Sequence, residues 1–196
     1  LQFVSVVASR TSQLLNYSDI SKDCGISEVT AKKWISLLVS SGLVYLLQPY
    51  SKNIEKRVVK TPKLYFMDTG LAAYLTRWTN PDVMRTGAMA GAFFETYVVS
   101  EIIKSFANNG EEAPIYFYRD KDKYEIDLLI EQNNTLYPIK IKKTASPTSD
   151  DAKNFFITNR IKNVQIGQCC VICNCSQVLN IKNKDISALA IPVEFI

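Results

Sequence analysis

Apolar side chains recur every three or four positions through the first forty residues, which is the spacing of amphipathic helices. The pattern predicts a first helix over residues 3–15, a short second helix that Ser18 caps and that stops at Gly25, and a third helix over residues 27–41. The apolar positions that predict the third helix are Val29, Ala31, Ile35, Leu38 and Val39. A short helix, a turn that contains glycine and a longer helix are the sequence pattern of a helix-turn-helix.

Beyond residue 42 the apolar period changes to two, which is typical of strands. Two strand-like runs, LVYLLQPY (residues 43–50) and KRVVKTPKLYFMD (residues 56–68), lie on either side of a polar loop. A β-hairpin after a helix-turn-helix has the form of a wing. We therefore predict a winged helix-turn-helix domain over residues 1–86.

A stretch of small residues from Gly87 to Gly91 marks the predicted boundary with a second domain over residues 87–196. This domain is predicted to open with the helix AFFETYVVSEIIKSFANNG and to continue with the strands PIYFYRD, YEIDLLIE and TLYPIKIKK. A helix over SPTSDDAKNFFITNR follows, with Thr148 and Asp151 spaced as a capping box, and VQIGQCCVIC and SALAIPVEFI supply further strands. The order α-β-β-β-α-β predicts an α/β (α+β) domain with a mixed sheet.

The composition fits a folded chain and excludes several classes of site. Of the 196 residues, 47% are hydrophobic and 21% are charged, which is the balance of a globular protein. No apolar run reaches membrane-spanning length and no signal-peptide pattern is present, so we expect a cytoplasmic protein without a membrane partner. The chain begins with Leu1 inside a helical pattern, and we expect it to be part of a longer protein. Because it has no histidine, His-based triads, His general bases and His metal ligands are excluded within it.

Charge is distributed unevenly between the two predicted domains. Residues 1–86 contain 11 Lys and Arg against 6 Asp and Glu, a net charge of +5, whereas residues 87–196 contain 12 against 13, a net charge of −1. The first domain is therefore the better candidate for contact with DNA. The predicted base and phosphate contacts are Ser27, Glu28, Thr30, Lys32 and Lys33 in the third helix and Arg57, Lys60 and Lys63 in the wing. The alternative is a rigid protein-docking or lid module, on which these lysines form a solvated face.

Four of the five cysteines gather in CCVICNC, at Cys169, Cys170, Cys173 and Cys175. An odd number of cysteines fits a reducing compartment better than a disulfide framework. Strand alternation would place Cys170 on the opposite face from the other three, whereas a tetrahedral zinc site usually draws its thiolates from two separated knuckles. We therefore interpret this segment as a buried core strand.

The candidate chemistry of the second domain lies on its first helix and on two of its strands. Glu95 shares a helical stripe with apolar residues, so it is predicted to point inward, where its carboxylate needs either a cation or a metal as partner. The polar positions of YEIDLLIE include Glu125 and Asp127, and those of LYPIKIKKT include Lys140 and Lys142. Two neighbouring strands would then present acidic and basic groups on one face of the sheet.

These residues resemble the metal site of the PD-(D/E)xK nuclease core, in which a helix Glu, an Asp on the second strand and a (D/E)-x-K motif on the third strand bind a divalent metal. The matching positions are Glu95, Asp127, Lys140 and Lys142. The resemblance implies a restriction-endonuclease-like core and catalytic roles for Glu95, Asp127 and Lys142. It leaves Glu95 and Asp127 as the metal ligands, if a metal binds at all.

The chain as a whole resembles the C-terminal region of a prokaryotic family of predicted AAA+-type P-loop ATPases. The blocks that carry the resemblance are ASRTSQLLNYSDISKDCGIS, AKKWISLLVSSGLVYLLQPY, KTPKLYFMDTGLAAYL, FFETYVVSEIIK, EIDLLI and IKKTASP. The resemblance implies an N-terminal ATPase module, then a winged helix, then a nuclease-like domain. No G-x-x-x-x-G-K-[ST] motif occurs in this chain, so the module, with its ATP and Mg²⁺, is expected outside it. That module and DNA are the expected partners, and an oligomeric assembly is compatible with the resemblance.

Lys140 changes the chemistry that the resemblance implies, since members of the family usually have Glu at its position. Three carboxylates and one lysine carry a net charge of −2, which one divalent cation neutralises. With Lys140 the four groups carry no net charge, and its ammonium repels a metal. The two lysines are expected either to pair with Glu95 and Asp127 or to face a phosphate backbone.

We therefore expect a DNA-binding or regulatory region with a degenerate, inactive nuclease-like site, and no cofactor within this chain. Two alternatives stay open. One is a nuclease dependent on Mg²⁺ or Mn²⁺ and coupled to the ATPase module, with Asp120, Asp122 or Glu125 as a substitute ligand. The other is a protein-interaction scaffold.

Overall fold

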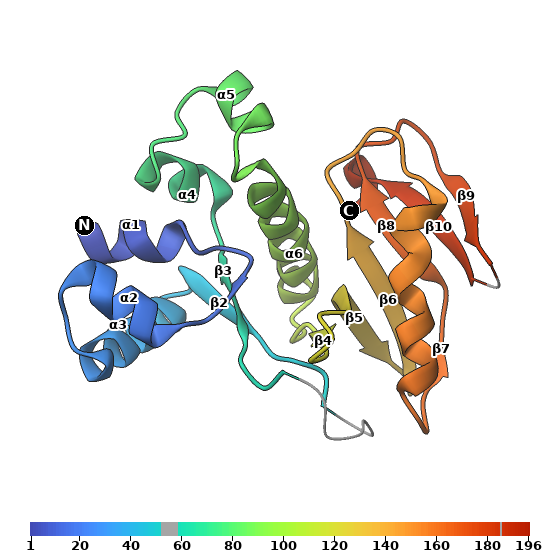
Figure 1. Ribbon diagram of the computed structural model, residues 1–196, viewed down its shortest axis with the longest axis horizontal. Coiled ribbons are helices and arrows are strands. Elements are labelled where there is room, and N and C mark those ends of the chain that lie inside the picture. The colour runs from blue at the N-terminus through green and yellow to red at the C-terminus, as the bar shows by residue number, and fades with distance from the viewer. Residues whose placement is uncertain (52–58, 185) are drawn as a thin grey trace. The chain divides into compact units, whose positions relative to one another are not determined.

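The computed structural model describes residues 1–51, 59–184 and 186–196 (Figure 1). The protein is a mixed α/β chain that divides into two compact units, of which the first combines residues 1–47 with 61–100 and the second combines residues 48–60 with 101–196. The division passes through the long helix α6, Ala90–Asn108, rather than falling at residue 87. The physical reason is that Phe93, in the first turn of α6, is buried in the core of the first unit.

The first unit contains short helices and a small antiparallel sheet. Its helices, apart from the start of α6, are α1 Gln2–Ala8, α2 Tyr17–Cys24, α3 Glu28–Ser40, α4 Thr69–Leu75 and α5 Pro81–Thr86. The strands of its sheet, in spatial order among the described residues, are β1 Gln13–Leu14, β3 Lys63–Phe66 and β2 Val44–Leu47. The expected hairpin is thus present, with Val44 opposite Phe66, and β1 adds a third strand to it.

The prediction of a first helix over residues 3–15 is wrong in its second half, because α1 ends at Ala8. The chain after α1 pairs with β3: the N–H of Ser12 donates to the carbonyl of Leu64 at 2.7 Å. The buried hydroxyl of Thr11 accepts from the N–H of Phe66 at 3.0 Å and lies 2.7 Å from the hydroxyl of Thr96. Tertiary hydrogen bonds therefore hold this segment beside β3, and the remaining local bonds, such as that from the N–H of Gln13 to the carbonyl of Arg10, span three residues instead of four.

The caps of the next two helices are local and were mostly predictable. Ser27 caps α3 as expected, its hydroxyl accepting from the N–H of Thr30 at 3.1 Å, and Gly25 ends α2 in the left-handed conformation, with φ 64°. The cap of α2 is Asn16 rather than Ser18, because the Asn16 side chain accepts from the N–H of Asp19. Asparagine is at least as good an N-cap as serine.

The burial of α3 differs from the predicted apolar stripe. Ala31 and Ile35 are buried, but Val29 is 63% exposed and Val39 is 38% exposed. Helical periodicity placed all these residues on one face, although the predicted residues that contact the core form a narrower row, Ala31, Ile35 and Leu38. Other members of the core of the first unit include Val7, Ile20, Leu64 and Phe66.

The second unit contains a seven-stranded mixed sheet, counted over its described residues. The strands are β4 Ile115–Arg119, β5 Glu125–Gln132, β6 Thr135–Ile141, β7 Gln165–Ile166, β8 Cys169–Cys173, β9 Leu179–Asn183 and β10 Ile186–Pro192. Their order is β4-β5-β6-β8-β10-β9, with β7 paired to one end of β6. The β4-β5-β6 pairs and the β10-β9 pair are antiparallel, whereas β6-β8 and β8-β10 are parallel. The predicted mixed sheet is therefore confirmed.

One helical segment, η1, Ser149–Arg160, lies against this sheet, and it is drawn in orange in Figure 1. It is a 3₁₀ helix rather than the expected α-helix. Ala152, Phe155 and Ile157 of η1 are buried with residues of β5, β8 and β10 in one hydrophobic core. A short 3₁₀ segment, η2, Val193–Phe195, ends the chain.

The strand that carries Lys140 is less regular than its sequence predicts. Ile139 and Ile141 are buried as expected, but Tyr137 is exposed and Pro138 is buried. In the neighbouring β5 all residues from Ile126 to Leu129 are buried, so neither face of this part of the strand is exposed. Within the described part of the chain, no helix combines the length and apolar character needed to cross a membrane.

Candidate functional site

Asp127 and Lys140 form an ion pair across two neighbouring strands. The antiparallel register of β5 and β6 sets Leu128 opposite Ile139, which brings the two charged residues side by side. Lys140 Nζ donates to Asp127 Oδ1 at 2.7 Å, and the N–H of Ile141 donates to Oδ2 at 2.7 Å. The side chain of Asp127 is 3% exposed and that of Lys140 is 27% exposed. Both oxygens of a buried carboxylate therefore have a donor.

This geometry decides which of the two expected roles Lys140 has. Its ammonium lies where a cation bound to Asp127 would lie, and it supplies the opposite charge that a buried carboxylate requires. A divalent ion would have to displace this ammonium and then tolerate it nearby. The residues present therefore do not fit a divalent metal at Asp127. Over the described ranges, no group of three or more His, Cys, Asp or Glu is placed to hold a metal ion.

Lys142 has a different partner, which the sequence did not indicate. It follows β6 directly, and its Nζ donates to the carboxylate of Asp151 in η1. Asp151 Oδ2 also accepts from the N–H of Thr148 at 2.8 Å. Burial favours a higher pKa for the Asp151 carboxyl, but the hydrogen bonds from Lys142 and Thr148 outweigh it and hold the pKa below its ordinary value. The residue expected to act as the catalytic lysine thus anchors η1 to the sheet.

Glu95 lies in the first unit and points inward, as its stripe predicted. Its Oε1 accepts from Lys63 Nζ at 2.9 Å and from the hydroxyl of Tyr65 at 2.6 Å. The side chain of Lys63 is 4% exposed and that of Glu95 is 16% exposed. The partner of Glu95 is therefore a cation from β3. Glu95 and Asp127 belong to different units of the chain.

The position of Lys63 contradicts its expected place on an exposed wing. The charge of Lys63 suggested a solvent-facing side chain, but all four residues of β3 are buried. The cation is tolerated inside because Glu95 neutralises it. Of the other wing residues, Lys60 is exposed, and Arg57 lies outside the described residues.

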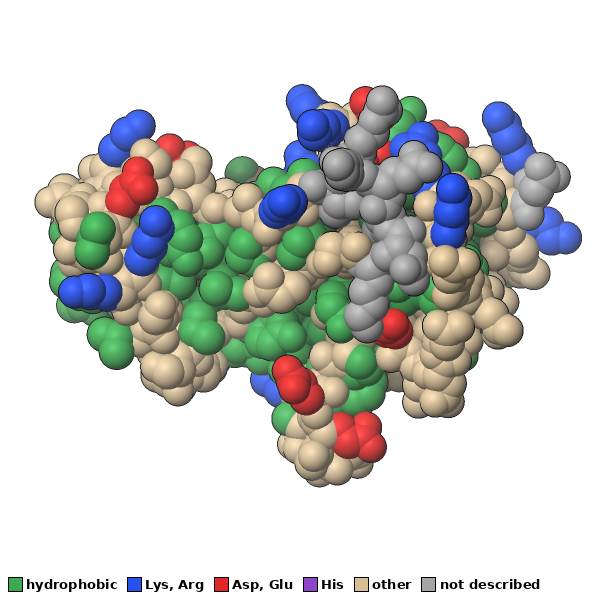
Figure 2. Space-filling view, turned by 90° about the horizontal axis from the view of Figure 1, so that it is seen from below, with side chains coloured by type: hydrophobic (Ala, Val, Ile, Leu, Met, Phe, Trp, Pro, Cys, Tyr) green, Lys and Arg blue, Asp and Glu red, His purple; other side chains and the backbone are tan. Residues whose placement is uncertain are grey.

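The residues expected on α3 form two groups. The hydroxyls of Ser27 and Thr30 lie 2.9 Å apart and belong to the helix cap. Glu28, Lys32 and Lys33 are exposed, and Lys32 Nζ lies 5.5 Å from the centre of the Tyr17 ring. The left side of Figure 2 shows separate Lys and Arg side chains with apolar surface between them.

Two of the three acidic residues considered as substitute metal ligands also have protein partners. Asp120 is buried, and its carboxylate accepts from Arg160 Nη1 at 2.8 Å and from the N–H of Tyr124 at 3.0 Å. Glu125 Oε2 lies 3.3 Å from Arg119 Nη1, and Asp122 is exposed. Protein donors thus satisfy the buried carboxylate of Asp120, as they do that of Asp127.

The cysteine segment forms a core strand, as its alternation predicted. Cys169, Cys173 and Cys175 are buried in the core of the second unit, and Cys170 is half-buried. Burial raises the pKa of Cys169 and of Cys173 to about 11. Burial thus favours the neutral thiol, which suits apolar packing.

Two family models together match most of the chain, and the change from one to the other falls between residues 82 and 90, not within α6. The model of a family described as "domain of unknown function (DUF4143)" matches residues 90–195, which is more than half of the chain. The chain belongs to the DUF4143 family. The DUF4143 match includes Glu95, Asp127, Lys140 and Lys142. A second model, "domain of unknown function (DUF8612)", matches residues 1–82.

The DUF4143 chain is also similar to two mycobacterial proteins. It is 27% identical over 144 residues to the uncharacterized protein Rv2008c of Mycobacterium tuberculosis and to the uncharacterized protein Mb2031c of Mycobacterium bovis. The match covers 74% of this chain but 32% of each relative, so the chain spans about a third of the length of these curated relatives. No solved structure matches the chain significantly.

Proposed function

We propose that the second unit is a nuclease-like domain without metal-dependent nuclease activity, which acts as a regulatory part of a larger protein. The observation that carries this proposal is the ion pair of Lys140 with Asp127. A catalytic metal would have to displace the Lys140 ammonium from Asp127 Oδ1 and would be repelled by it, while Oδ2 accepts from the N–H of Ile141. Lys142, the proposed relic of the catalytic lysine, binds Asp151.

The larger protein in this proposal is an AAA+-type ATPase, and the chain is its C-terminal, non-ATPase part. Two facts support it: the sequence blocks given above resemble that family, and the curated relatives are about three times as long as the matched segment. In this proposal the ATP- and Mg²⁺-binding module lies elsewhere in the protein and is the principal partner of the chain.

The first prediction concerns nuclease activity. The chain is expected to leave supercoiled and single-stranded DNA intact in the presence of Mg²⁺ or Mn²⁺, because the acid that would hold the metal is paired with Lys140. The assay measures nicked and linear product on a gel over time, with Asp127→Ala as the control for contaminating nuclease. Cleavage that needs the metal and disappears in Asp127→Ala would contradict the proposal and favour the active nuclease coupled to an ATPase.

A second proposed function is contact with DNA through α3 of the first unit. A short helix, a three-residue turn and a longer helix are followed by the β2-β3 hairpin, which is the order of elements in a winged helix. Lys32 and Lys33 are exposed near the start of α3, where a recognition helix contacts DNA. The buried Lys63 is no part of this proposed surface.

Replacing Lys32 and Lys33 together by glutamine is expected to weaken DNA binding and to lower the salt slope of log K by about 2, since each phosphate contact contributes about 0.9. Fluorescence anisotropy with a labelled duplex, measured over a range of salt concentrations, gives both quantities. The matched control replaces Lys182 and Lys184, which are exposed on the second unit, and should leave the slope unchanged. Absence of binding by the unaltered chain at low salt would favour a protein-interaction scaffold instead.

A further inference from the structure

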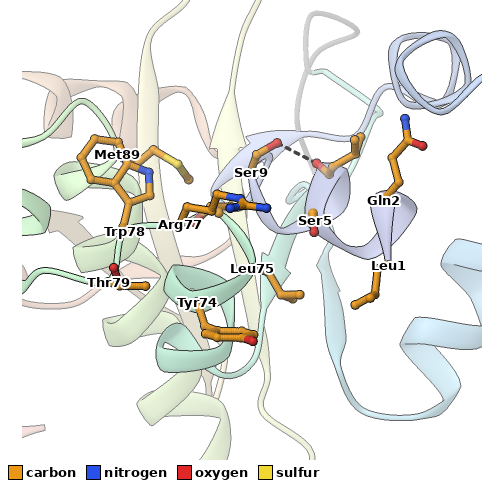
Figure 3. A pocket seen from close by; sticks show the side chains of 12 residues that line it. Leu1, Gln2, Ser5, Ser9, Tyr74, Leu75, Arg77, Trp78, Thr79 and Met89 are labelled. Carbon is orange, nitrogen blue, oxygen red and sulfur yellow. Dashed lines mark hydrogen bonds between the residues drawn. The ribbon is translucent and has the colours of Figure 1, made fainter.

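A groove of about 900 Å³ lies within the first unit, and its lining contains none of the ion-paired residues named above. One side is formed by α1, and the other by the end of α4 and the residues that follow it (Figure 3). Met89, just before α6, completes the lining. Its volume is within the range of about 300–1,000 Å³ that is typical of small-molecule sites.

The lining combines apolar surface with one charged side chain. Tyr74, which is 70% exposed, Leu75 and Trp78 supply apolar area from one side, and Val6 supplies it from α1. Among the described residues, Arg77 is the only charged side chain in the lining, and no acidic side chain balances it there. Figure 3 shows Arg77 extending from the α4 side toward the labelled serines of α1. The groove is therefore complementary to an apolar molecule that carries a negative charge.

Arg77 occupies a backbone position that favours a different residue. It follows the C-cap of α4 with a φ of 63°, in the left-handed region, and the N–H of Trp78 donates to the carbonyl of Ala73 at 2.8 Å. This is the helix-ending conformation in which glycine is preferred, because a side chain there is strained. Within the described part of the chain, no acceptor lies within hydrogen-bonding distance of the Arg77 guanidinium. Arg77 therefore has a strained backbone conformation, and its guanidinium has no hydrogen-bonding partner among the described residues.

Trp78 is held in place beside this arginine. The backbone of Gly87 lies against its indole ring so closely that a Cβ at that position would overlap it. A fixed aromatic surface next to an unpaired guanidinium is a pre-organised arrangement, which lowers the cost of binding.

We propose that this groove binds a small molecule with an apolar, ring-sized body and one carboxylate. The carboxylate pairs with the guanidinium of Arg77, which presents parallel N–H donors suited to it. The apolar body lies against Trp78, Tyr74 and Leu75. The proposal concerns the first unit alone and does not depend on the inactive nuclease-like site or on DNA binding.

The test uses phenylbutyrate as the probe and Trp78 as the reporter. The chain has two tryptophans, so a Trp34→Phe background leaves Trp78 as the single source of tryptophan fluorescence. Acetylation of Leu1 removes the α-amino charge from the groove. Phenylbutyrate is expected to quench Trp78 saturably, and the neutral phenylbutyramide is expected to bind about tenfold more weakly, because it cannot form the charge-assisted hydrogen bonds.

The decisive variant is Arg77→Gly. It removes the guanidinium and relieves the left-handed strain, so it is expected to weaken phenylbutyrate binding about tenfold and to raise Tm by about 2–4 °C. Arg77→Lys keeps a cation and should retain most of the binding without the rise in Tm. The proposal is overturned if phenylbutyrate fails to quench Trp78, or if Arg77→Gly binds it as tightly as the unaltered chain does.

Discussion

Replacing Lys140 by glutamate is expected to lower the Tm of the chain by about 6–12 °C in the presence of EDTA, and added Mn²⁺ or Mg²⁺ is expected to restore much of that loss. The variant removes the partner of the buried Asp127 and sets a second carboxylate beside it. Breaking a buried pair costs about 3–5 kcal/mol, and because Lys140 is 27% exposed we take the lower end, about 3 kcal/mol. For a chain of this length, each kcal/mol changes Tm by about 2–4 °C.

The recovery with metal follows from the same charges. Two adjacent carboxylates repel each other until a divalent cation lies between them, so the ion that the unaltered chain excludes becomes stabilising. Thermal unfolding with EDTA and with each metal measures the effect, and calorimetry measures the binding directly. Lys140→Gln is the matched control, since it breaks the pair without adding a carboxylate and should show the loss but not the recovery. An equal recovery in both variants would mean that the metal acts elsewhere.

Replacing Lys63 by methionine is expected to destabilise the first unit by about 3–5 kcal/mol, because it leaves the Glu95 carboxylate without its cation in a site that is nearly closed to water. Methionine keeps most of the length and apolar stem of lysine, so little packing is lost with the charge. Tyr65 would still donate to Glu95 Oε1, but a neutral hydroxyl does not offset a buried charge. The measurement is the free energy of unfolding in urea or the Tm of the chain.

The control for Lys63→Met is Lys60→Met, three residues earlier in the same segment. Lys60 is exposed, so its replacement should change the free energy of unfolding by less than about 0.5 kcal/mol. Adding Glu95→Gln to Lys63→Met should recover part of the lost stability, because the pair is then removed together. Equal stabilities for Lys60→Met and Lys63→Met would contradict the buried pair. They would indicate instead that Lys63 is exposed, as first expected for a wing residue.

The helix ends show where local sequence was sufficient and where it was not. The cap at Ser27 and the stop at Gly25 depend on hydrogen bonds within a few residues, and both were predicted. The end of α1 depends on the hydroxyls of Thr11 and Thr96, which are 85 residues apart in the chain. Periodicity cannot predict a helix end that a distant partner determines.

For the charged residues, too, the sequence was sufficient in some cases and tertiary contacts decided the others. The inward direction of Glu95 followed from its helical stripe, and the pairing of Lys140 with Asp127 was one of two outcomes that the sequence left open. The partner of Lys142 was not predictable, because Asp151 already had a sufficient local role in the capping box of η1. For Lys63 the charge indicated a surface position, and only the burial of all four residues of β3 decided otherwise.

The sequence by itself determined the mixed α/β class, most of the strands of the second unit, the core position of the cysteine strand and the excess of positive charge in the first half. These properties depend on neighbours in the chain and on composition, which a sequence contains. The tertiary structure alone decided which carboxylate each lysine binds, and with it whether Asp127 is open to a metal. The physical reason is that the energy of a buried charge depends on the few groups within hydrogen-bonding distance, and strand register and packing set that distance.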